Sequence, residues 1–360
     1  MSFQIELYNE SFQDYALKFY NKASLMDLSE EYILECLEYS HKLNSANLPI
    51  IYDGFHFSQL VGIESSYVYT ISNSSHDFYR YYDIKKKNGK TRKIAEPFEL
   101  LKEIQKWILN EILLNIETSK YSKAYKKNFS IKDNARFHQN QNVVICMDIK
   151  SYFPSIKISK VFNFFRELGY NEAVATLLSE LCCLNGSLPQ GAPTSPCLSN
   201  LLSIKLDDEL ANLAELLSTD GQRVRYSRYS DDITFSGNNI NPSKLIPWAY
   251  DILRNNGFQP NLDKTRVLRQ NTCQMVTGIV VNKKMQVSKR KRLKLRQQLY
   301  YINKFGLLNH MANADIDMPP KKYLQSLLGQ VNFVCFLNPK DSTFKHYSKY
   351  LKILLKNFRY

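Results

Sequence analysis

Three aspartates carry the strongest chemical signal in this sequence. Asp231 and Asp232 are adjacent and precede the β-rich run 233–235, and Asp148 ends the apolar run 143–147. An isolated pair of aspartates would indicate no more than a solvated turn. Three carboxylates at the ends of neighbouring strands repel one another unless cations bind there. They are the ligands that two Mg²⁺ ions need for an in-line phosphoryl transfer.

A sheet must position these carboxylates, and helices must cover it. Period and composition predict strands over 67–71, 79–84, 143–147, 279–281 and around 233–235. The turn-like residues 87–90 follow the strand predicted over 79–84 and indicate a hairpin there. Apolar spacing predicts helices over 27–39, from Pro97 to Ile112 and over 288–305, whereas Pro193 and Pro196 argue against a helix before Leu198. Helices over a mixed sheet are the predicted architecture.

Charge is concentrated near the C-terminus. The 360 residues carry a formal net charge of +14, while residues 281–360 alone hold 17 basic and three acidic side chains. Residues 1–40 hold eight acidic and two basic side chains. A basic surface with interspersed aromatic residues is typical of proteins that bind polyanions, although many basic proteins bind no nucleic acid.

Composition excludes several protein classes. With 12 Gly, 12 Pro and 13% aromatic residues, the chain is not collagenous or wholly disordered. The sequence holds no apolar run long enough for a membrane span and no signal peptide pattern, so we expect a cytoplasmic protein without a membrane partner. Seven cysteines without metal-ligand spacing indicate reduced thiols.

Three motifs in order resemble those of reverse transcriptases. They are Tyr229-Ser230-Asp231-Asp232, the segment 148–155 (DIKSYFPS) and the segment 188–196 (LPQGAPTSP). The resemblance implies that Asp148, Asp231 and Asp232 are catalytic and bind two Mg²⁺ ions, or Mn²⁺ as a substitute, with the backbone carbonyl of Ile149 completing one coordination sphere.

The same resemblance implies a dNTP pocket. Phe153 would exclude a 2′-hydroxyl, and Gln190 and Gly191 would line the pocket beside Ser151 and Tyr152. The segment 85–94 resembles the fingers hairpin, in which Arg92 and one of Lys85 to Lys87, assigned to Lys86, would bind the triphosphate. Lys264 would protonate or steady the pyrophosphate. A solvated lysine-rich turn and a surface lysine are the alternatives for the two basic sites.

Two further motifs resemble those of retron reverse transcriptases. Residues 134–138 match NAxxH and residues 276–278 match VTG. The resemblance implies roles in primer or RNA binding for Tyr229, Asn134, His138, Val276, Thr277 and Gly278. His138 alone would more often be a structural histidine.

Basic residues on a predicted helix follow the VTG motif. Residues 289–296 place six cations in eight positions, including Lys289, Arg290, Arg292 and Arg296. Such a helix could bind phosphates, an anionic membrane or water. Its position after VTG favours a thumb helix along a template-primer duplex.

The predicted fold is α+β, a right-hand polymerase with an antiparallel palm sheet. Its parts are an N-terminal helical extension (1–45), fingers (46–142), palm (143–280, with an inserted fingers segment at about 157–187) and thumb (281–360). Whether residues 1–45 cover the fingers or meet a partner is open, and a terminal helical extension is favoured.

The resemblance implies a retron RNA-directed DNA polymerase. Such an enzyme copies part of a cognate structured noncoding RNA into multicopy single-stranded DNA from dNTPs, primed by an internal 2′-hydroxyl. It would serve antiphage defence with a separately encoded effector protein. The alternatives are a reverse transcriptase of a group II intron or of another defence system, and a non-catalytic RNA-binding subunit.

Overall fold

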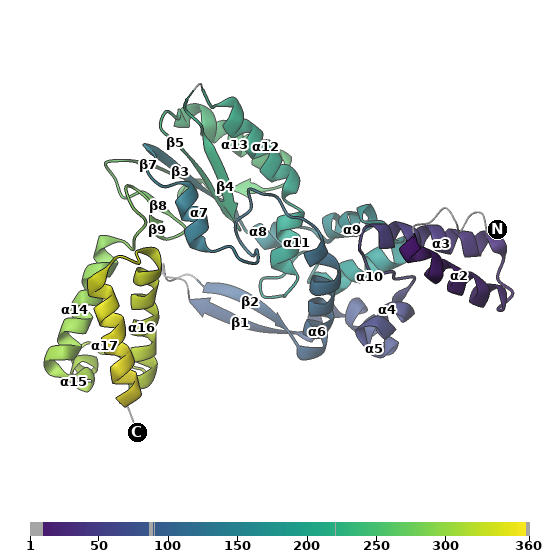
Figure 1. The fold of residues 1–360 in the computed structure, drawn as a ribbon, viewed down its shortest axis with the longest axis horizontal. Coiled ribbons are helices and arrows are strands. Elements are labelled where there is room, and N and C mark those ends of the chain that lie inside the picture. Colours follow the sequence, from purple (N-terminus) through teal and green to yellow (C-terminus); the bar gives the residue numbers. More distant parts are fainter. Residues whose placement is uncertain (1–9, 86–88, 90, 220, 358–360) are drawn as a thin grey trace. The chain divides into compact units, whose positions relative to one another are not determined.

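The computed structural model describes residues 10–85, 89, 91–219 and 221–357 (Figure 1). Internal contacts divide the chain into two compact units. The first comprises residues 1–125, 149–208 and 253–259, and the second comprises residues 126–148, 209–252 and 260–360. The four-part division into extension, fingers, palm and thumb stays a prediction.

Helices make up most of the first unit. Side-chain caps begin three of them: Ser29 accepts a hydrogen bond from Tyr32 N at the start of α3, Asp53 from His56 N at the start of α4, and Asn171 from Val174 N at the start of α10. The helices of this unit are α2 (Glu10–Ser24), α3 (Glu30–Ser45), α4 (Gly54–Val61), α5 (Ser65–Asn73), η1 (Ser75–Phe78), α6 (Glu99–Trp107), η2 (Ile108–Ile112), η3 (Leu113–Asn115), α8 (Tyr152–Ser155), α9 (Ile158–Glu167), α10 (Glu172–Cys182) and α11 (Ser195–Leu201).

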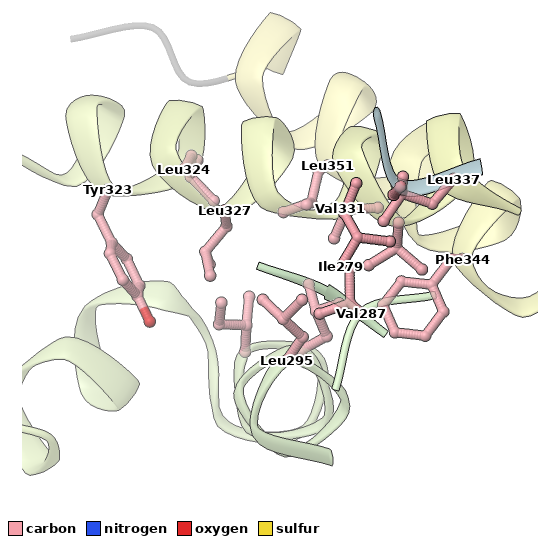
Figure 2. Close-up of a cluster of buried hydrophobic side chains, with 14 of the residues drawn as sticks. Ile279, Val287, Leu295, Tyr323, Leu324, Leu327, Val331, Leu337, Phe344 and Leu351 are labelled. Atoms are coloured by element: carbon pink, nitrogen blue, oxygen red, sulfur yellow. The ribbon is translucent and has the colours of Figure 1, made fainter. Parts of the chain in front are cut away.

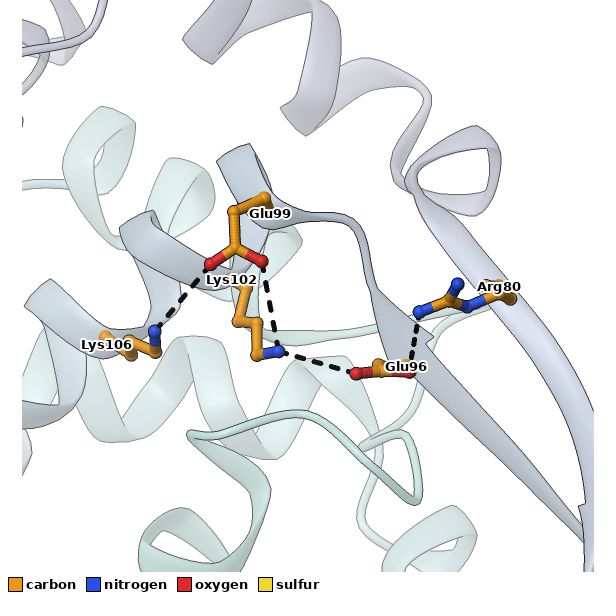
Figure 3. Close-up of polar contacts among 5 residues, drawn as sticks. All are labelled: Arg80, Glu96, Glu99, Lys102 and Lys106. Carbon is orange, nitrogen blue, oxygen red and sulfur yellow. Dashed lines mark hydrogen bonds and ion pairs between the residues drawn. The ribbon is translucent and has the colours of Figure 1, made fainter.

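A β-hairpin in the first unit is held by ion pairs at its base. β1 (Tyr79–Lys85) pairs antiparallel with β2 (Thr91–Pro97), as the sequence predicts. Figure 3 shows Glu96 of β2 between Arg80 of β1, at 3.0 Å, and Lys102 of α6, at 3.4 Å. These two cations lower the pKa of the Glu96 carboxyl, with the hydrogen bond from Arg80 as the larger cause. The network joins the hairpin to the helix that follows it.

Two predictions for the first unit are wrong. Residues 67–71, expected to be a strand, lie in α5, whose inward-facing Val68 and Ile71 are three residues apart. The aromatic and β-branched composition of this segment concealed its helical spacing. The other error concerns α11, which begins at Ser195 before Leu198 because Pro196 occupies its first turn, where no hydrogen-bond donor is needed.

The second unit is built on an antiparallel sheet. The strands lie in the order β4-β5-β3-β6, and β7 also pairs with β3. β3 (Val143–Lys150) is buried along nearly all its length. The other strands are β4 (Arg225–Tyr229), β5 (Asp232–Gly237), β6 (Gln259–Pro260), β7 (Arg266–Arg269), β8 (Met275–Val276) and β9 (Ile279–Val280), and the accompanying helices are α7 (Ile131–Phe137), α12 (Ile204–Leu216), α13 (Pro242–Asn255) and η4 (Leu262–Lys264).

Four helices near the C-terminus pack around one apolar cluster. They are α14 (Lys289–Phe305), α15 (Leu307–Asn313), α16 (Pro320–Leu337) and α17 (Ser342–Asn357). Figure 2 shows Leu295 of α14, Leu327 of α16 and Leu351 of α17 directed toward Ile279 and Val287. The cluster therefore joins these helices to the β8–β9 hairpin.

No helix within the described ranges is long and apolar enough to span a bilayer.

Candidate active site

The end of β3 places two of the predicted carboxylates opposite each other. In the β3–β5 register, Asp148 pairs with Asp232. Asp148 is 5% exposed, whereas Asp232 remains exposed. Directly opposed residues of an antiparallel pair have Cβ atoms about 4.5–5.5 Å apart, and like charges there destabilise the pair. This register favours binding of a cation between the two side chains.

A two-residue turn carries the third carboxylate. Tyr229 of β4 pairs with Asp232 of β5, so that Ser230 and Asp231 form the turn. Ser230 has φ of 60°, and a positive φ at the first central residue is typical of turns that match the twist of a hairpin. The hairpin thus holds Asp231 next to the Asp148–Asp232 pair.

A buried arginine supports this turn, and sequence reasoning did not single it out. Nη1 of Arg228 donates a hydrogen bond of 3.2 Å to the carbonyl oxygen of Ser230. Arg228 is fully buried. The only sequence signal was a basic residue inside a strand that ends at two acids. We assign Arg228 a role in positioning the turn.

Two residues of the segment after α13 hold Asp148. Nζ of Lys264 lies 2.6 Å from one carboxylate oxygen, and Nδ2 of Asn261 donates to the other at 2.8 Å. The backbone N of Asn261 also donates to the carbonyl oxygen of Asp148. Lys264 therefore neutralises the Asp148 carboxylate here, and its predicted role at the pyrophosphate stays a prediction. Asn261 was not among the predicted site residues.

The carboxylates interact electrostatically. The pKa of Asp232 is raised to about 6, first by loss of hydration in its cavity, then by the charges of Asp231 and Asp148, while Lys264 opposes the shift. A raised pKa means that the ionised form is disfavoured where the three acids meet. A bound cation would relieve that cost.

Two of the three VTG residues line the same cavity as Asp148 and Asp232. A cavity of about 520 Å³ is lined by Asp148, Asp232 and Lys264 together with Thr277 and Gly278. Thr277 and Gly278 form the turn between β8 and β9, with φ of 45° and 83°. The hydroxyl oxygen of Thr277 is buried and has no hydrogen-bond partner within the described part of the chain. Val276 is fully buried in the apolar cluster instead.

The donor set suits a hard cation, although the side chains are not gathered around one point. Within the described residues, no group of three or more His, Cys, Asp or Glu side chains stands close enough to hold a metal ion. The carboxylate of Asp148 is instead engaged by the ammonium of Lys264. Carboxylate oxygens are the ligands that Mg²⁺ prefers, so the chemistry of the three acids fits this ion.

The two fixed polar residues of NAxxH are buried in the second unit. His138 is fully buried, and its ring nitrogens lie 2.7 Å from the hydroxyls of Ser236 and Ser227. Ser227 in turn donates to Oδ1 of Asn134 at 2.6 Å. Burial of both side chains favours the structural alternative for His138, and the predicted RNA contact of Asn134 and His138 stays a prediction.

The residues predicted to bind dNTP in the first unit include a tightly packed loop. The carbonyl oxygen of Gln190 accepts a hydrogen bond of 2.8 Å from Ala95 N of β2. Gly191 has φ of 132°, and a Cβ at this position would lie 2.4 Å from the carbonyl oxygen of Ala95. The sequence predicted that Gly191 allows close approach of the substrate, and here it allows close approach of β2. Arg92 is exposed on β2, and Lys86 lies outside the described residues.

The segment after Asp148 divides into an anchor and a half-buried ring. Tyr152 is 2% exposed, and its hydroxyl donates to the carbonyl oxygen of Ser199 at 2.8 Å. The ring of Phe153 is half-buried beside Tyr125, with the ring centroids 6.5 Å apart. Ser151, with φ of 52°, turns the chain into α8. Ser151 is exposed and Phe153 is half-buried, so these two side chains remain accessible whereas Tyr152 does not.

The basic helix α14 contains both exposed and paired cations. Lys289, Arg290 and Arg296 are exposed. Arg292 instead pairs with Asp341 at 2.6 Å, and both side chains are largely buried. Its guanidinium also lies over the ring of Phe344, at 5.0 Å from the centroid. Arg292 therefore stabilises the packing of α14 against α17.

Comparisons with known proteins identify the family. Residues 84–292 match the family model described as reverse transcriptase (RNA-dependent DNA polymerase). The retron Ec86 reverse transcriptase of Escherichia coli is 31% identical over 266 residues, which cover 72% of this chain and 81% of that protein. The retron Mx162 reverse transcriptase of Myxococcus xanthus is 34% identical over 230 residues, which cover 56% of this chain and 46% of that protein.

A solved structure of a foamy viral protease-reverse transcriptase in complex with double-stranded DNA is similar at 18% identity, with a TM-score of 0.45. The match covers 78% of this chain and 39% of the viral chain.

The family match and the observed antiparallel sheet with its helices confirm the predicted α+β class and right-hand polymerase fold. The chain belongs to the reverse transcriptase family and is an RNA-directed DNA polymerase of the retron type.

Proposed function

We propose that Asp148, Asp231 and Asp232 carry out nucleotidyl transfer with two divalent metal ions. The observation that supports this most is the register that sets Asp148 opposite Asp232 beside the turn that holds Asp231. Bound Mg²⁺ would lower the pKa of the attacking hydroxyl and neutralise charge on the leaving pyrophosphate. Mn²⁺ has similar oxygen preferences and is a substitute ion.

The residues around the acids prepare the site in two ways. Lys264 and Asn261 fix the orientation of Asp148 through both of its carboxylate oxygens. Arg228 fixes the turn that carries Asp231. Holding charged groups in place before substrate arrives is the main source of electrostatic catalysis, because no reorganisation is then needed during the reaction.

We propose a nucleotide pocket made by Phe153, Gln190, Gly191 and Arg92, with Lys86 as a second triphosphate ligand. Its support is chemical. The exposed guanidinium of Arg92 suits a phosphate, and the half-buried ring of Phe153 is rigid enough to exclude a 2′-hydroxyl. The fixed loop at Gly191 supplies a rigid wall.

We further propose that the template is a cognate structured noncoding RNA. Retron relatives support this, as do the exposed cations Lys289, Arg290 and Arg296 of α14, which suit a nucleic acid backbone. Synthesis would start from an internal 2′-hydroxyl of that RNA and yield branched single-stranded multicopy DNA. A separately encoded effector protein would act with it in antiphage defence.

The test is sequencing of the nucleic acid that copurifies with the expressed protein, with and without debranching and RNase treatment. We expect one RNA species joined to DNA through a 2′-linkage. Recovery of DNA that needs no debranching would contradict the priming proposal. Recovery of no specific RNA would favour a group II intron-like or other defence enzyme.

The catalytic assignment is tested separately with the purified protein on a primed RNA template. Asp231→Asn should reduce Mg²⁺-dependent dNTP incorporation by more than about 100-fold, since loss of a group that only supports a metal ligand already costs about 10- to 100-fold. Asp208→Asn, an exposed aspartate on α12, is the matched control and should keep wild-type activity. Equal activity of the two variants would refute the assignment.

A further inference from the structure

A second cavity lies within the C-terminal helices of the second unit, apart from the carboxylate cavity in its lining. It has a volume of about 430 Å³ and lies between the C-terminal half of α14 and α15. Its size falls in the range of small-ligand sites, about 300–1,000 Å³. None of its lining residues belongs to the motifs that define the family site. Its occupant is therefore an open question.

The deep part of this cavity is polar and uncharged. Nε2 of Gln298 donates to the hydroxyl of Tyr323 at 3.1 Å, and that hydroxyl lies 3.1 Å from Nε2 of His310. The tyrosine hydroxyl accepts from Gln298 and is able to donate its own proton to His310 when Nε2 is the unprotonated nitrogen of the neutral ring. Burial also lowers the pKa of His310. A neutral, hydrogen-bonding group fits this end better than an ion.

Flat aromatic faces and side-chain amides line the rest. The rings of Tyr301 and Phe305 line the cavity and are 37% and 49% exposed. Gln297 and Asn313 also line it and remain exposed. A primary amide offers both donors and an acceptor, which is the pattern that the edge of a nucleobase presents. Aromatic faces stack with unpaired bases of any sequence.

Positive charge is confined to the entrance. Lys294 lines the cavity and is exposed, and it lies on the same helix as Lys289 and Arg290. Lys304 lies over the ring of Phe305, at 5.1 Å from its centroid. A phosphate-bearing strand that follows these cations would pass the entrance, so that one base could turn inward. The separation of charge outside from neutral polar groups inside matches the two parts of a nucleotide.

We infer that this cavity binds one unpaired nucleotide, with its base between Tyr301 and the amides and its phosphate at Lys294. The inference deepens the proposed function, because it assumes that the protein binds a structured RNA. Unpaired nucleotides also occur in the DNA product, and the chemistry of the cavity is shared by both sources. Recognition of single-stranded bases by stacking is the usual way in which proteins bind structured RNA specifically.

The experiment measures binding of the full-length protein to a fluorescent, mixed-sequence, 12-nucleotide unpaired RNA by anisotropy over a series of salt concentrations. Tyr301→Ala should weaken binding about 5- to 100-fold, the range for loss of one base stack. The slope of affinity against salt should not change, since no phosphate contact is lost. Tyr301→Phe should keep the affinity, and Gln297→Ala should lose about 2- to 10-fold.

Tyr300→Ala is the matched control. Tyr300 is adjacent on the same helix and 54% exposed, but it does not line the cavity. We expect it to bind RNA as the wild type does, and urea midpoints of both alanine variants identify any loss of folding. The same 12-mer made as DNA distinguishes the two sources of the nucleotide. If Tyr301→Ala loses affinity for RNA only, the cavity binds the noncoding RNA; if it loses affinity for both equally, the cavity also binds the DNA product.

Wild-type RNA affinity in Tyr301→Ala would overturn the inference. The same result with loss of a copurifying protein would assign the cavity to a protein partner instead, which also overturns it. A wild-type protein that neither binds the RNA nor extends a primer would overturn the proposed function as well. A wild-type protein that extends a primer while Tyr301→Ala binds normally would overturn this inference alone.

Discussion

Removal of the cation at Lys264 should destabilise the metal-free protein, because Asp148 would then lie uncompensated next to two other acids. The Asp148 side chain is 7% exposed, and the Lys264 side chain is 56% exposed. Removing one partner of a fully buried ion pair costs about 3–5 kcal/mol, whereas exposed pairs contribute about 0–1 kcal/mol. With one partner buried and the other half-exposed, we expect Lys264→Met to lose about 1–2 kcal/mol.

The assay is urea unfolding of the wild type, Lys264→Met, Asp148→Asn and the double variant in EDTA. The double-mutant cycle should give a coupling of about 1–2 kcal/mol between the two side chains. Asn261 still donates to Asp148 in the single variant, so the protein should remain folded. Added Mg²⁺ should narrow the gap between Lys264→Met and the wild type, because the ion replaces the lost cation. A coupling near zero, or a gap that Mg²⁺ widens, would refute this account of the site.

Three further predictions follow from packing and charge. Gly191→Ala should destabilise the protein by about 2–4 kcal/mol in urea unfolding, because its Cβ would meet the carbonyl oxygen of Ala95 at 2.4 Å. Gly186→Ala is the control: Gly186 has φ of 71°, its Cβ would have no atom within 4 Å, and the free energy of unfolding should fall by only about 1–2 kcal/mol. His138→Ala should cost about 3 kcal/mol by removing two buried hydrogen bonds and leaving the Ser236 hydroxyl without its partner, since Ser227 still donates to Asn134, and a stable variant that has lost RNA affinity would instead support the direct contact. The pKa of Asp232 is higher in the folded protein than in the unfolded chain, so metal-free stability should fall as the pH rises from about 4 through 6. Because Asp232 is exposed, we expect the free energy of unfolding to fall by about 1 kcal/mol between pH 5 and pH 7.5, as measured by denaturation in EDTA. Asp232→Asn should abolish that part of the pH dependence.

The chemistry of the site was predictable where it depends on residue type and order. Asp148 could be placed because an apolar run ends at an acid, and Asp231 and Asp232 because they directly precede the β-rich run 233–235. The hairpin β1–β2 and helix α14 were predictable for similar reasons, since turn residues and apolar spacing are local signals. These elements carry their information within a few residues.

Properties that depend on distant partners could not be predicted. Arg228 and Asn261 are ordinary polar residues in sequence, and only the folded sheet shows that they hold the turn and Asp148. His138 and Arg292 resemble binding residues until their buried partners are known. The strand predicted over 67–71 failed because tertiary packing overrode the β-propensity of its residues.

The length of the β4–β5 turn sets which face of the sheet carries the acids. Side chains alternate between the two faces of a strand, so a shift of one residue would send Asp232 to the opposite face from the one it now shares with Asp148. One glycine inserted after Ser230 would lengthen the turn and move Asp231 relative to the Asp148–Asp232 pair without removing any carboxylate. Substitutions within the turn keep the spacing, while an insertion or a deletion does not. At position 230 the hairpin should accept Gly or Asn, which adopt a positive φ readily, better than a change in length.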